Sequence, residues 1–132
     1  MPQESPISVL IADDDQRMVD TLTALIESRP FLRLAGVGGD ATEAVAIATQ
    51  VRPCVALLDV RMPGGGASTA RSIRAASPRT RCVALSAYCD LDSLAAMREA
   101  GVVDYLLKGR ASVADIVRAI RRAAGQDGDR PT

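Results

Sequence analysis

The chain has 132 residues, 48% of them hydrophobic and 24% charged, and its sixteen basic residues balance sixteen acidic ones. This length fits one domain with a buried core. The balanced charge, with one phenylalanine and two tyrosines, argues against a basic, base-stacking surface for nucleic acid. No apolar run approaches the roughly 18 residues of a membrane span, and no secretory signal opens the chain. We therefore expect a cytoplasmic protein without membrane contact or direct nucleic-acid binding.

Five short apolar runs alternate with segments of helical periodicity along the chain. The runs cover residues 8–12, 32–37, 54–58, 82–85 and 102–107. Their nearly continuous apolar character is typical of parallel strands that are covered by helices on both faces. Between them, apolar residues recur at helical spacing, so the sequence predicts five consecutive βα units.

Proline and glycine punctuate this alternation and support the predicted element ends. Pro30 and Pro78 are expected to close helices, Pro53 to open a strand, and Gly101 to end the fourth helix. Right-handed crossovers then predict a flavodoxin-like (βα)5 doubly wound parallel sheet with strand order 2-1-3-4-5. We assign this single domain to residues 7–124, preceded by a disordered leader over 1–6. Residues 125–132 are expected to be a disordered tail, or a linker to an output domain beyond this sequence.

Reactive side chains stand where the predicted strands end, which is where such sheets bind ligands. They are Asp13, Asp14 and Asp15 after strand one, Asp59 after strand three, Ser86 after strand four and Lys108 after strand five. Asp15 has the position of a helix N-cap. The other carboxylates would repel one another unless a cation neutralised them, and Mg²⁺ prefers such oxygen ligands. The sequence therefore predicts a magnesium site.

The same group of side chains suits phosphoryl transfer. That reaction needs positioning and charge neutralisation more than covalent help from the protein. The chain contains no histidine, so a Ser-His or Cys-His nucleophile pair is excluded. An aspartate can instead form an aspartyl phosphate, and Asp59 on the central strand is the position best surrounded by the other groups.

Four segments at these strand ends, VLIADD, LLDVRMP, ALSA and YLLKG, together resemble the receiver domains of bacterial two-component response regulators. The resemblance spans roughly residues 7 to 124. It implies that Asp13 and Asp14 hold Mg²⁺, with Asp14 as the direct ligand and Asp13 acting partly through water. It also implies that Asp59 is both phosphoacceptor and metal ligand, that the backbone carbonyl of Arg61 completes the protein ligands, and that Mn²⁺ can substitute.

The resemblance further implies a signalling switch. Ser86 and Lys108 would contact the phosphoryl group, which a partner histidine kinase would supply and which the domain would lose by slow autodephosphorylation. Tyr105 occupies the position of an aromatic switch residue, so the face formed by helix four, strand five and helix five is the expected output surface, with homodimerisation on phosphorylation as one outcome. Ser86 replaces the commoner threonine, and Lys108 is followed by Gly109 instead of proline. The Lys-Gly pair and the Met-Pro-Gly-Gly-Gly loop resemble most the LuxR/NarL-type branch, whose full-length members carry a helix-turn-helix output domain and regulate transcription.

Two alternatives stay open at this point. A phosphatase resembling the haloacid dehalogenases would use Asp13 as nucleophile, with Asp15, Ser86 and Lys108 in that family's order. Arg17 stands where that family has threonine or valine, and no acidic pair follows Lys108. The other alternative is a degenerate receiver that binds partners without being phosphorylated, although every chemical position is filled.

Two smaller expectations follow from the sequence. Cys54 and Cys82 border apolar runs, so we expect both thiols to be packed as small hydrophobic groups. Arg61 and Tyr88 lie two residues beyond Asp59 and Ser86, and their bulk is expected to obstruct the hydrolytic water and prolong the life of a phosphoryl group.

Overall fold

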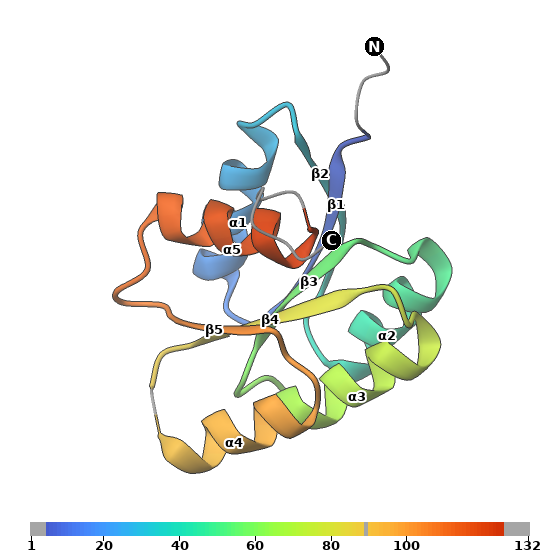
Figure 1. Cartoon of the computed structure of the whole chain (residues 1–132), viewed down its shortest axis with the longest axis vertical. Coiled ribbons are helices and arrows are strands. Elements are labelled where there is room, and N and C mark those ends of the chain that lie inside the picture. The colour runs from blue at the N-terminus through green and yellow to red at the C-terminus, as the bar shows by residue number, and fades with distance from the viewer. Residues whose placement is uncertain (1–4, 89, 126–132) are drawn as a thin grey trace.

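The computed structural model describes residues 5–88 and 90–125, which form a five-stranded parallel sheet between two layers of helices (Figure 1). The strand order is β2-β1-β3-β4-β5, which confirms the flavodoxin-like prediction. Most of the expected leader and tail, residues 1–4 and 126–132, lies outside the described residues. Within the described part, no helix is long and apolar enough to cross a bilayer.

The elements alternate along the chain as the sequence predicted. The strands are β1 Ile7–Ala12, β2 Leu32–Gly38, β3 Val55–Asp59, β4 Arg81–Ser86 and β5 Asp104–Leu107. The helices are α1 Gln16–Glu27, α2 Ala41–Val51, α3 Gly66–Ala76, α4 Leu91–Glu99 and α5 Val113–Ala123. Helices α1 and α5 cover one face of the sheet, and α2, α3 and α4 cover the other (Figure 1).

Each face of the sheet has its own apolar core. Alternate residues of the central strands point to opposite faces, as the pleat requires. Val9 and Leu57 pack with α1 and α5, whereas Leu10 and Leu58 pack with α2 and α3. Every residue of β1 and β3 is buried, which explains why these runs carry no polar alternation. The polar side chains that follow these strands are consequently held at fixed positions at the carboxyl edge of the buried sheet.

The start of β5 differs from the expected one by two residues. The prediction began the strand at Val102, but helix α4 ends in a tight turn in which Gly101 has φ 91° and the Val102 amide donates to the Met97 carbonyl at 3.0 Å. This bond belongs to the helix end. There a glycine with positive φ turns the chain back, so that the amides that follow can donate to helix carbonyls that would otherwise lack donors. Val102 therefore belongs to the turn that closes α4, and the strand begins at Asp104.

The two cysteines within the described residues have different surroundings. Cys82 is buried in the core beside α3, and burial raises the pKa of its thiol to about 12. Cys54 is exposed, so the expectation that it is packed was wrong. It lies in the turn before β3, one residue short of the buried strand, where its Sγ accepts a weak hydrogen bond from Ser8 Oγ at 3.5 Å.

Candidate functional site

Three carboxylates meet at the carboxyl edge of the sheet. Asp13 and Asp14 follow β1 directly, and Asp59 is the last residue of β3, which pairs with β1. One carboxylate oxygen from each lies within 4.8 Å of the other two. Asp13 and Asp59 are buried, whereas Asp14 is exposed. The geometry therefore brings together the three acidic residues that the sequence analysis singled out.

Asp13 is fixed by its own turn. Its amide donates to the Gly38 carbonyl of β2 at 3.0 Å, and its Oδ1 accepts from the Asp15 amide at 2.9 Å. Asp15 caps α1 by accepting from the Arg17 amide at 3.0 Å, as expected from the sequence. The other oxygen of Asp13, Oδ2, is buried and forms no hydrogen bond of good geometry with any described residue. It faces the Lys108 ammonium group instead.

Lys108 places its ammonium group between two of these carboxylates. Its Nζ lies 2.8 Å from Asp13 Oδ2 and 3.5 Å from Asp59 Oδ1, and its side chain is only 13% exposed. Its amide donates to the Ser86 carbonyl at 2.8 Å, which holds the lysine level with the end of β4. Burial alone would lower the pKa of Lys108, but the pairing with Asp13 and Asp59 prevails and raises it. The ammonium group is therefore a permanent positive charge at neutral pH.

The surroundings of Asp59 disfavour the charged form of its carboxyl group, although positively charged groups lie close by. Burial is the largest cause that raises its pKa above the ordinary value, and the charge of Asp13 adds to it. The Arg61 amide, which donates to Asp59 Oδ1 at 3.2 Å, and the Lys108 charge both oppose this shift. A buried carboxylate whose negative charge the protein offsets only in part favours the binding of a cation.

The oxygen donors at this edge fit a small divalent cation. Mg²⁺ binds through one or more carboxylates and keeps several waters. The three clustered carboxylates offer one oxygen each, and the buried Asp13 Oδ2 is paired with the Lys108 ammonium group. The donor set contains no sulfur or imidazole, which excludes the usual structural zinc site.

The Ser86 hydroxyl is engaged elsewhere in this structure. It donates to the Tyr88 carbonyl at 2.6 Å and accepts from the Tyr88 amide at 3.2 Å. The hydroxyl of Tyr105 donates to the same carbonyl at 3.2 Å, and the tyrosine itself is half-buried. Among the described residues, no hydrogen bond joins Ser86 or Tyr105 to the carboxylates. Both are instead connected to each other through the loop that follows β4.

One contact near the site was not anticipated from the sequence. The Arg61 guanidinium lies 4.7 Å from the centre of the Tyr88 ring, a cation–π contact between the loops that follow β3 and β4. Both residues are bulky, but their pairing could not be predicted from the sequence, because they are far apart in the chain and the pairing depends on two side-chain conformations. The contact joins the two loops, and the Arg61 amide also bonds to the Asp59 carboxylate.

Comparison with known proteins assigns the family. The model of the response regulator receiver domain matches residues 9–121, and the chain therefore belongs to the response regulator receiver family. The signal receiver domain of the response regulator NarL from Mycobacterium tuberculosis superposes with a TM-score of 0.87, at 26% identity, over 92% of this chain and 98% of that domain. The receiver domain of Thermotoga maritima CheB superposes with a TM-score of 0.82, at 26% identity, over 91% and 97% of the two chains.

Sequence relatives point to one branch of this family. The chain is 32% identical over 119 residues to the transcriptional regulatory protein LiaR of Bacillus subtilis, which covers 89% of this chain and 56% of LiaR. It is 30% identical over 116 residues to the transcriptional activator DevR/DosR of Mycobacterium tuberculosis, which covers 87% and 53%. These are LuxR/NarL-type response regulators, as the loop motifs indicated. The chain spans about half the length of these curated relatives, and the family assignment favours the signalling switch over the phosphatase alternative.

Proposed function

We propose that Asp59 accepts a phosphoryl group from a partner histidine kinase and that the resulting aspartyl phosphate switches the α4–β5–α5 face. The observation that carries this proposal is the position of Lys108 Nζ, 2.8 Å from Asp13 and 3.5 Å from Asp59. An ammonium group shared by two carboxylates can transfer its attraction to a phosphoryl oxygen that arrives between them. A solvated surface lysine would instead extend into water, away from the two carboxylates.

The transfer needs one bond made and one broken. An Asp59 oxygen attacks phosphorus, the bond from phosphorus to the donor's imidazole nitrogen breaks, and that nitrogen keeps the electron pair and takes up a proton. Lys108 remains beside the equatorial oxygens and offsets their charge. Asp13, Asp14, Asp59 and the backbone carbonyl of Arg61 are the groups that would hold Mg²⁺, which neutralises the phosphoryl charge when bound, and Mn²⁺ offers similar coordination chemistry.

The switch would act through the loop after β4. Ser86 and Tyr105 share one acceptor, the Tyr88 carbonyl. A phosphoryl group on Asp59 would offer the Ser86 hydroxyl a charged acceptor, and charge-assisted hydrogen bonds are stronger than the neutral bond it now makes. Loss of the bond from Ser86 would leave the Tyr88 carbonyl bonded to the Tyr105 hydroxyl, so a movement of the loop would move the Tyr105 side chain with it. Phosphorylation shifts this equilibrium only by its preference for one arrangement.

Intact mass tests the proposal. The purified chain is incubated with acetyl phosphate, a small phosphodonor, in the presence of Mg²⁺ or of EDTA. We expect the wild type to gain the mass of one phosphoryl group only with Mg²⁺, and Asp59→Asn to gain none. Asp92→Asn, an exposed aspartate on α4, is the matched control and should behave like the wild type. Equal modification of wild type and Asp59→Asn would refute the assignment and support a degenerate receiver.

A further inference from the structure

The amino edge of the sheet, at the opposite end of the strands from the carboxylate site, carries a pocket. It encloses about 480 Å³ between the turn before β3, the turn before β4 and the end of α5. Asp59 is at the other end of β3, about 13 Å from Val55 at a rise of about 3.3 Å per residue. A molecule in this pocket would therefore not touch the carboxylate site, and the pocket is separate from the proposed phosphoacceptor.

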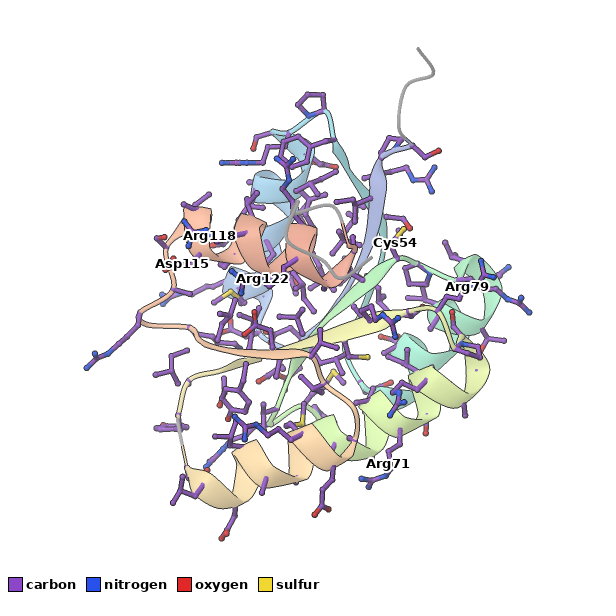
Figure 2. All side chains as sticks on the ribbon, viewed as in Figure 1. Cys54, Arg71, Arg79, Asp115, Arg118 and Arg122 are labelled. Atoms are coloured by element: carbon purple, nitrogen blue, oxygen red, sulfur yellow. The ribbon has the colours of Figure 1, made fainter. Side chains whose placement is uncertain are left out.

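Three arginines line this pocket without any carboxylate. They are Arg52, Arg79 and Arg81, all exposed. Within the described part of the chain, their side chains form no hydrogen bond or ion pair, although other surface arginines such as Arg118 pair with acidic neighbours. Figure 2 shows Arg79 near the end of the sheet where Cys54 lies, whereas Arg71 points away from α3 outside the pocket. The pocket is thus a concentration of positive charge in a chain of zero net charge.

Arg52 occupies a backbone position that favours glycine or asparagine. It is the C-cap of α2 with φ 52°, the single non-glycine residue of positive φ among the described residues. The left-handed conformation costs an ordinary side chain about 1 kcal/mol or more, and helices usually end there in glycine or asparagine. The fold does not require arginine at this position, because glycine or asparagine would adopt the same backbone conformation with less strain. The strain therefore points to a use for the arginine side chain.

The turns that bear the arginines are fastened together beneath the pocket. The buried Thr80 hydroxyl donates to the Pro53 carbonyl at 2.6 Å and is bonded to the Ser77 hydroxyl at 2.7 Å. The Arg81 amide donates to the Cys54 carbonyl at 3.0 Å. These bonds hold the α2–β3 and α3–β4 turns at a fixed separation. A preformed frame lowers the ordering cost of binding.

We propose that this pocket binds an acidic peptide segment of a partner protein. Guanidinium groups pair with carboxylates through two parallel hydrogen bonds, and three arginines line one small cavity. The remaining walls are two prolines, Cys54 and two alanines at the end of α5, Ala123 and its C-cap Ala124, which suit short aliphatic stems. No aromatic residue lines the cavity for base stacking, so a nucleic-acid ligand is disfavoured. The site lies apart from Asp59 and does not depend on phosphorylation.

Fluorescence anisotropy with a labelled, end-blocked peptide of alternating glutamate and alanine tests this site in the full chain. The glutamine analogue of the peptide is the control for charge. We expect the glutamate peptide alone to bind. Arg79→Gln and Arg81→Gln should each weaken binding about two- to fivefold, as expected for single exposed ion pairs. Arg71→Gln, an exposed arginine outside the pocket, is the matched control and should leave the affinity unchanged. Equal losses in all three variants would overturn the proposal, because they would report only general attraction.

A further variant separates binding from folding. Arg52→Asn relieves the left-handed strain, so the thermal midpoint should rise while the peptide affinity falls; a variant that merely unfolds would lower both. Alkylation of Cys54, followed by mass spectrometry of its own peptide, should slow when the acidic peptide is bound. Unchanged alkylation would overturn the assigned place, and tighter binding of a single-stranded oligonucleotide would overturn the ligand class.

The chain's own acidic residues after α5 are the remaining competitor. Asp127 and Asp129 follow Ala124 closely in the sequence. We expect Asp127→Asn with Asp129→Asn to leave the peptide affinity unchanged. A rise in affinity would show that the chain's own segment occupies the pocket and would overturn the assignment to a partner. Asp59→Asn should bind the peptide like the wild type, so failure of this proposal and failure of the phosphoacceptor proposal are distinguishable.

Discussion

Removal of the Asp59 charge should stabilise the protein when no divalent cation is present. At an effective dielectric constant of about 20, two buried charges at the 4.8 Å limit of this cluster repel by about 3.5 kcal/mol, and by more when closer, whereas opposite charges 3.5 Å apart attract by about 4.7 kcal/mol. Asp59 is repelled by Asp13 and, more weakly, by the exposed Asp14, and it is attracted by Lys108. These contributions nearly cancel, so the burial of the carboxylate decides the balance, in agreement with the raised pKa of Asp59.

Asp59→Asn should therefore increase the free energy of unfolding in EDTA at pH 7 by about 1–3 kcal/mol, the cost of burying such a group. For a domain of this size that is a rise of about 4 °C in thermal midpoint for each kcal/mol. Saturating Mg²⁺ should stabilise the wild type, by about 2.7 kcal/mol at 100 times its Kd, and the variant much less. When Mg²⁺ is added, the thermal midpoint of the wild type should thus approach or exceed that of the variant.

The pH dependence has a definite sign. A carboxyl group whose pKa is raised by folding binds its proton more readily in the folded state, so its contribution opposes folding above that pKa. The stability gap between Asp59→Asn and wild type in EDTA should therefore close as the pH falls from 7 toward 4. Urea unfolding at several pH values measures this gap, with Asp20→Asn on the surface of α1 as the control. A gap that widens at low pH, or a variant less stable than wild type in EDTA, would refute the reasoning.

Three further predictions concern the surroundings of the site. Arg61→Asn combined with Tyr88→Ala removes the cation–π contact and two bulky side chains, so the phosphoryl group should decay about two- to fivefold faster, measured by intact mass over time; an unchanged decay rate would count against obstruction of the hydrolytic water by these side chains. Lys108→Ala should slow phosphoryl acceptance while tightening Mg²⁺ binding in calorimetry, because a competing positive charge is gone from Asp13; weaker Mg²⁺ binding would contradict this. Ser112→Ala breaks the capping box of α5 and should cost about 1 kcal/mol of stability in urea unfolding without slowing phosphorylation; a loss of phosphorylation would show that the cap matters to the site.

The sequence was sufficient for the fold and for the meeting of the charged groups because both rest on strand ends. Continuous apolar runs define buried parallel strands, and the polar residue that follows each run must then lie at the carboxyl edge. Asp13, Asp59 and Lys108 were placed correctly on this argument. The error at Val102 arose because an apolar residue that closes a helix end looks the same in sequence as one that begins a strand.

Contacts that depend on side-chain conformation could not be predicted in this way. The contact of Arg61 with the Tyr88 ring and the hydrogen bond from the Tyr105 hydroxyl to the Tyr88 carbonyl join segments from different strands. The exposure of Cys54 depends on where one turn ends, a matter of a single residue. The arginine pocket needs two turns and the end of a helix to meet at one edge, and no local pattern marks it. Sequence periodicity reports which residues are buried, but it carries no information on how polar side chains pair across loops.

The most direct test of the account identifies the phosphorylated residue itself. Borohydride reduces an aspartyl phosphate to homoserine, which marks the position permanently for peptide mass spectrometry. After incubation with acetyl phosphate and Mg²⁺, the account predicts homoserine at position 59 and at no other aspartate, and no homoserine when EDTA replaces Mg²⁺. Homoserine at position 13 would assign the nucleophile to the phosphatase alternative, and its absence from every aspartate would contradict the proposed phosphoacceptor.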